Sequence, residues 1–310
     1  MVSLKKFIKL IAIILAFILV IPLTYGAGYL IGSVQNKQNE ETDYVKPDEI
    51  LNVMTLNICS WSFDGKDSET RVTGIANTIR DNEIDSIGLQ EATPYWMEAL
   101  NNELKDEYSY VGVGSNTAKD CIGNTDNEDE FTAIFYLKSK FNVVDWGYFW
   151  LSETPQTPSY GWGSAYRRIC TWVILENKHT NTQYVHINTH FDNASSEARR
   201  NSIGMILDKV KEFKDLPVVF TGDLNFIEIS RGYKDITADV LKDTKVLAKD
   251  TMDSQTYHGA DPNAYKGYVL DYILINDGFT ALKYKVVKKR YNNRYISDHH
   301  AVVTKLEVSS

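Results

Sequence analysis

The sequence contains very little cysteine. Its 310 residues include Cys59, Cys121 and Cys170, and there is no C-x-x-C pair. Three scattered thiols are too few for a disulfide framework, and a structural zinc site would need thiolates at motif spacing. One bridge with a leftover thiol is compatible with this number. Free thiols that are buried or partly buried are the simpler interpretation.

Positive charge is also scarce. The formal net charge is -8, and residues 1–36 hold three lysines and no acid, so the rest of the chain carries 30 basic against 41 acidic groups, a balance of -11. A tight, non-specific nucleic-acid binder needs a basic face that displaces counterions. The composition argues against that class, but it is compatible with a nuclease whose acids hold metal ions.

Internal repeats and low-complexity tracts are absent, and the longest apolar run lies at the N-terminus. Residues 7–31 are almost wholly apolar, with Lys9 as their one charge, and Lys5 and Lys6 come directly before them. A helix of about 20 apolar residues spans a bilayer. The basic flank predicts a single-pass anchor in the cell membrane, with the C-terminal bulk outside the cytoplasm. A cleaved signal peptide and secretion are the alternative. The lack of a clear small-x-small site and the continuation of the run through Ile31 favour the anchor.

The composition divides the chain into three parts. We expect residues 1–32 to form the membrane anchor (or signal peptide), and the polar residues 33–49 to form a linker. Hydrophobic content of 43% and charged content of 24% indicate that the rest is globular. Residues 50–310 are long enough for one sizeable α/β domain with its own core.

Many β-type runs and few helical ones are expected in this domain. Val72, Ile75 and Ile79 recur at helical spacing, and Thr93 followed by Pro94 is typical of a helix start. We predict a four-layer α/β sandwich, with two mostly antiparallel sheets face to face and helices outside, after the N-terminal transmembrane helix. The predicted helices cover 69–82, a segment from 93 and 194–213, and the predicted strands cover 50–58, 84–89, 108–113, 131–137, 141–150, 169–176, 183–189, 216–221, 268–275, 280–288 and 301–308.

Polar side chains collect at the ends of these apolar runs. Polar groups at the ends of separate strands are how a sheet builds a shared site. Oxygen ligands suit Mg²⁺ or Mn²⁺ better than zinc, since there is no thiolate pair and no H-E-x-x-H, and such ions serve phosphoryl transfer. Singly, each group could be an ordinary turn or helix-start residue. The groups are Asn57, Glu91, His190, Asp223 with Asn225, Asp298 with His299, and Asp271 within a sixth run.

Six motifs resemble, in content and order, those of the metal-dependent endonuclease/exonuclease/phosphatase superfamily. They are T-L-N-I, I-G-L-Q-E, N-T-H-F-D-N, G-D-L-N, L-D-Y-I-L-I and S-D-H-H-A-V, and the resemblance covers nearly all of 50–308. This superfamily includes pancreatic-type deoxyribonucleases, apurinic endonucleases, neutral sphingomyelinases, inositol-polyphosphate 5-phosphatases and deadenylases. The stretches F-W-L-S-E-T-P at 149–155 and R-I-C-T-W at 168–172 resemble a compact bacterial branch.

The resemblance implies a role for each residue in a metal half of the site. Glu91 would be the principal ligand of Mg²⁺ or Mn²⁺, with Asn57 and Asp298 close to the same ion. Asp223 and Asn225 would orient the attacking water and the phosphate, or bind a second metal.

The resemblance also implies a phosphate half. His299 would be the general base or a phosphate stabiliser, held in one tautomer by Asp271. The scissile phosphate would be contacted by His190, which Glu130 orients, by Asn225 and by Arg168. Among the other histidines, we assign His179 and His186 to structure, expect His300 to face away from His299, and leave His258 open.

The resulting hypothesis is a metal-dependent hydrolase of phosphate esters. Phosphodiester hydrolysis of nucleic acid or a phospholipid head group comes first, because His190 and His299 form a pair. A phosphomonoesterase acting on a sugar or nucleotide phosphate is the alternative, suggested by the acidic composition. A catalytically silent surface binding module is the alternative from another class, and the intact motifs argue against it. No obligate protein partner is implied. We expect loops 114–130, 152–166 and 255–267 to select the substrate.

Overall fold

The computed structural model describes residues 49–60, 68–259 and 267–309. The predicted anchor, and the predicted linker except for Glu49, lie outside the described residues. Within the described ranges, no helix combines the length and the apolar character that a bilayer crossing needs.

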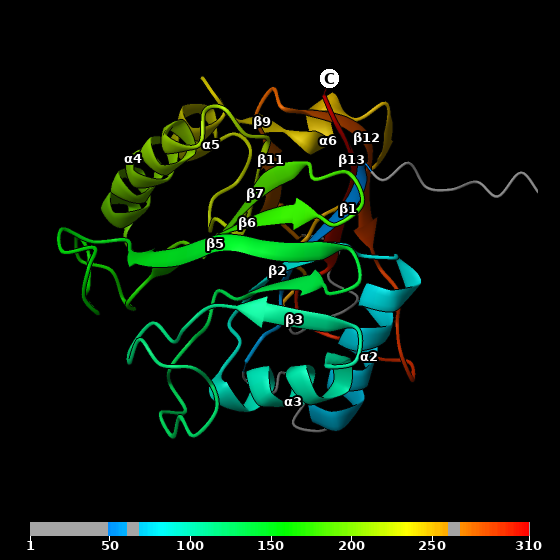
Figure 1. The fold of residues 1–310 in the computed structure, drawn as a ribbon. Helices are drawn as coiled ribbons and strands as arrows, with labels where there is room; N and C mark the ends of the chain where they lie inside the picture. The colour runs from blue at the N-terminus through cyan, green and yellow to red at the C-terminus, as the bar shows by residue number, and fades with distance from the viewer. Residues whose placement is uncertain (1–48, 61–67, 260–266, 310) are drawn as a thin grey trace, which may run out of the picture. The chain divides into compact units, whose positions relative to one another are not determined.

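The described strands form two sheets (Figure 1). The first has the order β10-β12-β13-β1-β2-β4-β3, and the second has the order β5-β6-β7-β8-β11-β9. Neighbouring strands are antiparallel except for β1 with β2, β7 with β8 and β10 with β12. The bounds are β1 Ile50–Asn57, β2 Ser86–Gln90, β3 Tyr108–Val111, β4 Ile134–Leu137, β5 Phe141–Trp150, β6 Ile169–Asn177, β7 Gln183–His190, β8 Val218–Asp223, β9 Lys242–Asp243, β10 Asp250–Met252, β11 Asp271–Ile275, β12 Phe279–Val287 and β13 Ala301–Val308.

The helices connect and cover these strands. The two central parallel pairs are each joined through a helix, α2 between β1 and β2 and α4 between β7 and β8, because parallel neighbours need a crossover connection. The bounds are α2 Ser68–Asp81, α3 Pro94–Leu104, α4 Ser196–Glu212, α5 Arg231–Ile236 and α6 Thr244–Leu247. The predicted long helices and strands are present. The short α5, α6, β9 and β10 were not predicted, because elements of two to six residues show no periodicity.

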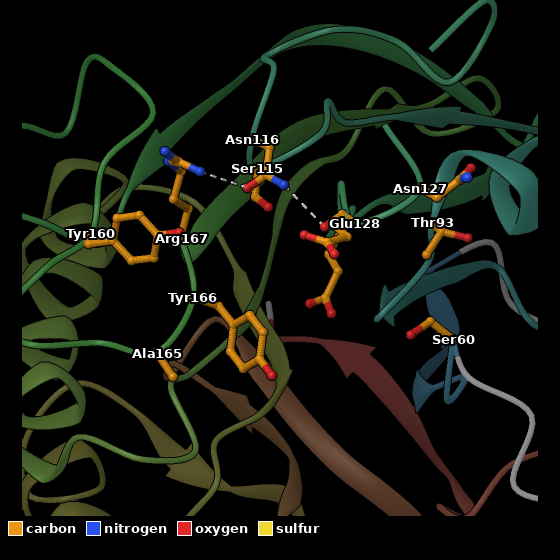
Figure 2. A pocket seen from close by; sticks show the side chains of 11 residues that line it. Ser60, Thr93, Ser115, Asn116, Asn127, Glu128, Tyr160, Ala165, Tyr166 and Arg167 are labelled. Carbon is orange, nitrogen blue, oxygen red and sulfur yellow. Dashed lines mark hydrogen bonds between the residues drawn. The ribbon is translucent and has the colours of Figure 1, made fainter. Parts of the chain in front are cut away.

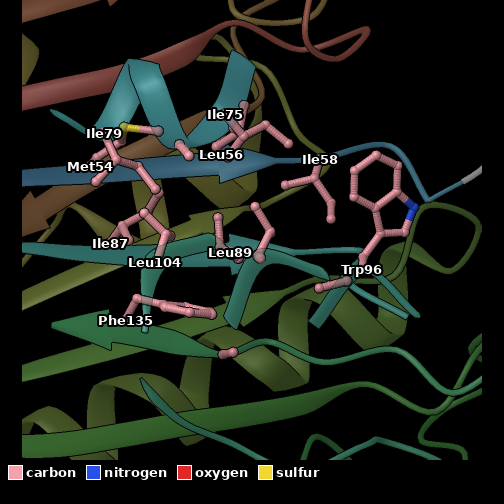
Figure 3. Close-up of a cluster of buried hydrophobic side chains, with 14 of the residues drawn as sticks. Met54, Leu56, Ile58, Ile75, Ile79, Ile87, Leu89, Trp96, Leu104 and Phe135 are labelled. Carbon is pink, nitrogen blue, oxygen red and sulfur yellow. The ribbon is translucent and has the colours of Figure 1, made fainter. Parts of the chain in front are cut away.

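Three apolar clusters define the layers. Helices α2 and α3 pack on the outer face of the first sheet, where Ile75 and Ile79 contact Met54 and Leu56 of β1 (Figure 3). Helix α4 packs on the outer face of the second sheet, in the cluster that holds Val185, Ile187, Ile203 and Ile206. Side chains of both sheets, such as Val53 and Val219, meet between them. The α/β sandwich of two face-to-face sheets with helices outside is confirmed.

A polar layer interrupts the apolar packing between the sheets. Gln90 of β2 donates through Nε2 to Asn188 Oδ1 of β7 at 2.7 Å. Thr221 of β8 donates to the same oxygen at 3.0 Å, and His186 lies between Ser86 and Thr221 at 3.0 and 2.9 Å. All five side chains are buried. The structural role predicted for His186 fits this position, which links one sheet to the other.

Candidate active site

Strand alternation places the predicted site residues on the faces that the two sheets turn toward each other. In β1, Leu51 and Val53 belong to the cluster between the sheets, and Asn57 follows on the same face two positions after Thr55. The same alternation places His190 of β7, Asp223 of β8 and Asp271 of β11 on the face turned toward the first sheet. Asp223 is paired in register with His190 on one side and with Asp271 on the other. Both sheets therefore contribute side chains to one buried polar centre.

Two residues of the centre have left-handed backbones. Glu91 has φ 58° and Asn225 has φ 50°. Alternation would send Glu91 to the helix side of the sheet with Ile87 and Leu89, but the left-handed turn brings its carboxylate to Asn57. Such conformations are uncommon for residues other than glycine and concentrate at functional sites. The chain therefore accepts local strain to bring these two side chains to the centre.

In the first half of the centre, Asn57 links carboxylates of both sheets. Its Nδ2 donates to Glu91 Oε1 at 2.9 Å and to Asp223 Oδ2 at 3.0 Å, while its Oδ1 accepts from the backbone of Cys59 at 2.9 Å. Asn57 thus turns its nitrogen toward the acids, and ligation through oxygen would require the amide to turn over. Ser297 Oγ donates to the Asn57 carbonyl at 2.6 Å and lies 3.3 Å from Asp298 Oδ1.

The second half contains a charged imidazole. His299 Nδ1 lies 2.8 Å from Asp271 Oδ2, and its Nε2 lies 3.8 Å from Asp223 Oδ2. Burial alone would lower the pKa of His299, but the carboxylates of Asp271, Asp223 and Asp298 outweigh it and raise the pKa to about 10. Asp271 thus lies in hydrogen-bond contact with the His299 ring, where the family resemblance places it, and the imidazole carries its proton at neutral pH.

His190 has the opposite electrostatic surroundings. Burial, followed by the charges of Arg168 and His299, holds its pKa well below the usual value, so the ring is neutral. Arg168 has only donors, and its Nη1 lies 2.9 Å from His190 Nδ1. Nδ1 therefore accepts, and the proton of the neutral ring is on Nε2, which lies 3.5 Å from Asp223 Oδ2. Asn225 Nδ2 lies 3.0 Å from Nε2 but is itself a donor, which bonds the Phe191 carbonyl at 2.9 Å, so a hydrogen bond from Nε2 to Asn225 would require the amide to turn over.

Glu130 closes this side of the centre. Its Oε2 lies 3.4 Å from Arg168 Nη1 and 4.0 Å from His190 Nδ1. About a quarter of the side chain is exposed (26%), yet burial of the carboxylate, opposed by Arg168, raises its pKa to about 7. Arg168 is also 3.7 Å from the buried Asp192, which accepts backbone hydrogen bonds from Ala194 and Ser195. Arg168, His190 and Glu130 thus lie together, as predicted.

The residues present fit a divalent cation. Within the part of the chain that the structure describes, one group brings three acidic or imidazole atoms within 4.8 Å of one another: Asp223, Asp271 and His299. The carboxylates of Asp223 and Asp271 are the ligands that this group offers, because a ligating His299 would have to lose its proton. Burial and the Asp271 charge raise the pKa of Asp223, and Asp271 Oδ1 is buried without a hydrogen-bond partner. Glu91 and Asp298 add two further carboxylates, so the centre concentrates negative charge that a cation would neutralise.

The remaining histidines lie outside the centre. His300 packs its ring on His258 at 4.4 Å and on Tyr295 at 4.9 Å, whereas His299 packs on Tyr257 at 4.8 Å. The two adjacent histidines thus have different ring neighbours, in line with the prediction for His300. His258, which the sequence left open, is buried in that outer group.

A pocket lies beside Glu130 (Figure 2). Its volume is about 460 Å³, within the usual range for small-molecule sites. Loops 114–130 and 152–166, two of the three predicted to select the substrate, supply most of its wall. The lining residues are Ser60, Thr93, Ser115, Asn116, Asn127, Glu128, Glu130, Tyr160, Ala165, Tyr166 and Arg167.

Several contributors were not predicted from the sequence. Ser297 fixes the Asn57 carbonyl, and Gln90 and Asn188 tie together the strands that lead to Glu91 and His190. Their signal was present, because polar residues in otherwise apolar β-runs need buried hydrogen-bond partners. What the sequence lacked was the pairing of the two sheets that identifies those partners.

The sequence model of the Endonuclease/Exonuclease/phosphatase family matches residues 54–299. The chain belongs to this family. No curated protein sequence matches the chain. Members of the family use divalent metals, which agrees with the buried acidic and imidazole groups of the centre.

Solved structures with the same fold include two from Bacteroides thetaiotaomicron. One, described as an endonuclease/exonuclease/phosphatase family protein, is 29% identical, covers 84% of this chain and 98% of its own, and has a TM-score of 0.76. The other, described as a mannosyl-6-phosphatase, is 29% identical, covers 83% and 99%, and has a TM-score of 0.73. D. rerio TDP2 with a single-strand DNA product is 15% identical, covers 84% and 99%, and has a TM-score of 0.64, a likeness of fold.

Proposed function

We propose that this chain hydrolyses phosphate esters with a water activated at a divalent metal site, Mg²⁺ or Mn²⁺. The observation that carries the proposal is the placement of a charged His299 and a neutral, Arg168-bonded His190 on either side of Asp223. Family membership supports phosphoester hydrolysis as the reaction class. A metal ion there would acidify a water and neutralise phosphate charge.

Each half of the centre has a proposed task. Glu91 and Asp298, with Asn57 once its amide turns over, are the proposed metal ligands. Asp223 and Asn225 orient the water and the phosphate. His299 holds its proton because Asp271 is 2.8 Å away, so we assign it to phosphate stabilisation rather than to base catalysis.

On the other side, the proposed task is to bind the phosphate. His190 presents Nε2–H, because Arg168 occupies Nδ1. Arg168 adds a guanidinium near the same space, and Glu130, whose Oε2 lies 3.4 Å from Arg168 Nη1, orients that guanidinium. Donors fixed before the reaction stabilise charge that develops on phosphate oxygens.

Two ester classes are candidates. The paired His190 and His299 support a phosphodiester, of nucleic acid or a phospholipid head group. A phosphomonoester of a sugar is the second candidate, favoured by the polar pocket beside Glu130 and by the 29% identical relative described as a mannosyl-6-phosphatase. A catalytically silent binding module is the remaining alternative.

A substrate panel tests the proposal. Bis-p-nitrophenyl phosphate, p-nitrophenyl phosphate, hexose 6-phosphates, plasmid DNA and sphingomyelin would be assayed with Mg²⁺, Mn²⁺ and EDTA. We expect turnover that EDTA abolishes and that His299→Ala and Glu91→Ala each reduce by at least about 10²-fold. His179→Gln, in the hairpin between β6 and β7, is the matched control and should retain full activity. Unchanged turnover in both site variants would remove this centre from the reaction.

The location is a separate proposal. We propose that residues 1–32 anchor the chain in the cell membrane with residues 50–310 outside the cytoplasm, supported by the apolar run and its basic flank. Protease treatment of intact cells should then digest the catalytic domain. Protection of that domain in intact cells, but not in lysed cells, would reverse the orientation.

A further inference from the structure

The pocket shares one residue, Glu130, with the phosphate half of the centre. Glu130 lines the pocket, and the same carboxylate lies 3.4 Å from Arg168, which contacts His190. Figure 2 shows Glu128 and Tyr166 bordering the space from two loops, with the Arg167 guanidinium turned toward Asn116 at its edge. The space beside His190, where we place the phosphate, therefore borders this pocket.

Both walls of the pocket are braced from behind. In loop 114–130, the buried Asp129 accepts from the backbone of Asn116 at 2.6 Å, from Thr117 Oγ1 at 2.5 Å and from Asn124 Nδ2 at 2.8 Å. On the other wall, Asp192 accepts from the backbone of Ala165 at 2.9 Å. Walls held in this way need little reordering when a ligand binds.

The lining is polar and its charge is mixed. Amides, hydroxyls, two carboxylates and one guanidinium face the space, and Ala165 is its single aliphatic side chain. Such a surface is mainly polar and is a poor match for an acyl chain. With Glu128 and Glu130 against Arg167, it is also a poor match for the repeated negative charge of a nucleic-acid backbone.

Each of the two aromatic rings of the pocket already contacts an arginine side chain. The guanidinium of Arg167 lies 4.6 Å from the ring centre of Tyr160, and that of Arg168 lies 4.9 Å from the ring centre of Tyr166. One face of each ring is thus covered by a cation. A nucleobase sandwiched between the two rings is disfavoured, while the phenol hydroxyls stay available as hydrogen-bond partners.

We propose that this pocket binds the sugar ring of a sugar phosphate. The inference rests on the proposed phosphoesterase function and adds the chemical class of the alcohol. A neutral ring with several hydroxyls offers donors and acceptors together, as the lining requires. Arg167, which Asn116 Oδ1 holds at 3.2 Å, and Glu128 are the proposed specificity residues, and neither is part of the phosphate centre.

Matched substrates separate the sugar from the phosphate. Mannose 6-phosphate and glucose 6-phosphate carry a hydroxylated ring, whereas p-nitrophenyl phosphate has the same phosphate and no hydroxyls. Arg167→Met keeps an unbranched apolar stem and removes the guanidinium with its donors. We expect kcat/KM for both hexose phosphates to fall roughly 10- to 100-fold, the loss of one or two hydrogen bonds to a charged group. For p-nitrophenyl phosphate the change should stay within about twofold.

Further variants serve as checks. Glu128→Gln, an isosteric change at an exposed position, should lower only hexose phosphate turnover and covers the case that Arg167→Met fails to fold. Arg231→Met removes an exposed guanidinium on α5 and should change neither substrate. Binding of free mannose, followed by saturation-transfer NMR, should be present in the wild type and lost in Arg167→Met.

The outcomes distinguish this inference from the function it rests on. If the wild type hydrolyses p-nitrophenyl phosphate but neither hexose phosphate, or if Arg167→Met and Glu128→Gln lower all substrates equally, the sugar pocket is wrong and the phosphoesterase stands. If the wild type hydrolyses none of the panel, the phosphoesterase itself fails. Selective loss on hexose phosphates supports the proposal.

Discussion

Two histidines of the same centre have opposite charge states because their neighbours differ. The carboxylate of Asp271 lies against His299 Nδ1, and the guanidinium of Arg168 lies against His190 Nδ1. The first favours the imidazolium and the second opposes it. Both rings are buried. Burial is the largest cause of the low pKa of His190 and Arg168 adds to it, whereas at His299 the nearby carboxylates, Asp271 first, outweigh burial and raise the pKa.

Asp271→Asn should therefore change the chemistry more than the fold. The amide keeps the shape but loses the charge that holds the proton on His299. We expect kcat to fall about 10³-fold with the domain still folded. NMR titration of the chelated protein should show that the pKa of His299 has dropped from its raised value, because Asp271 is the largest of the carboxylate contributions that oppose burial and only Asp223 and Asp298 then remain.

Asp243→Asn is the matched control for this change. Asp243 is a buried carboxylate in the same sheet, and it caps α6 by accepting from the backbone of Lys245 at 2.9 Å. Its loss should lower stability and leave kcat within about twofold. Equal effects of the two substitutions on kcat would mean that Asp271 acts through the fold alone.

His186 gives a pH dependence of stability that is separate from the active centre. Burial lowers its pKa from 6.5 to about 3. Between these values the unfolded chain binds a proton that the folded protein does not, so stability is full above about pH 6.5 and falls as the pH drops. At about pH 5 the loss from this ring amounts to about 2 kcal/mol.

His186→Gln isolates this contribution. Urea unfolding at about pH 7 and pH 5 should show a loss of free energy that is about 2 kcal/mol smaller in the variant than in the wild type. Other buried histidines titrate equally in both proteins, so the difference reports His186. His179→Gln should behave as the wild type. An identical pH slope in His186→Gln would show that the ring is already charged in the folded state.

At the scale of elements, the close approach of β2 to β7 and β8 depends on a glycine. A Cβ at Gly88 would lie 2.2 Å from Thr221 Oγ1 and 2.4 Å from Asn188 Oδ1. Gly88→Ala must therefore displace the polar layer between the sheets, and we expect the free energy of unfolding to fall by about 2–3 kcal/mol.

Gly204→Ala is the control, with the opposite expected sign. Gly204 lies inside α4, and nothing is within 4 Å of a Cβ built there. Alanine should stabilise this helix by roughly 0.5–1 kcal/mol. Urea unfolding gives the change in the free energy of unfolding for both variants. A Gly88→Ala protein as stable as the wild type would show that the sheets can separate without loss.

The main strands and helices were predictable from periodicity, and the candidate site residues from polar side chains at strand ends and from the family motifs. Period-2 alternation ending in polar residues placed Asn57, His190 and Asp223 on one face of their strands, and the family motifs supplied the partners. Glu91 departs from alternation because its φ is 58°, a backbone state that residue identity does not reveal. The orientation of the Asn57 amide, with its nitrogen toward the acids, depends on contacts between distant parts of the chain. So do the hydrogen bonds by which Asp129 holds loop 114–130, and no local sequence pattern reveals either.

At the scale of the whole domain, the centre exists only when the two sheets meet. Asn57 of the first sheet donates to Asp223 of the second at 3.0 Å, and this contact joins residues 166 positions apart in the sequence. Carboxylates from both sheets are thereby brought close together. A cation bound between them would favour the packed sandwich over the unfolded chain, since the unfolded chain has no such site.

Metal should therefore stabilise the domain measurably. At about 100 times the dissociation constant, Mg²⁺ or Mn²⁺ should add about 2.7 kcal/mol, which for a domain of this size raises the Tm by about 5–10 °C relative to EDTA. Glu91→Gln keeps the shape and removes one charge, so most of the shift should be lost. Glu176→Gln, on β6 beside Gln183, should retain the full shift. Calorimetry with and without EDTA measures all three proteins. A wild-type Tm that is equal in both conditions would contradict a metal bound by these carboxylates.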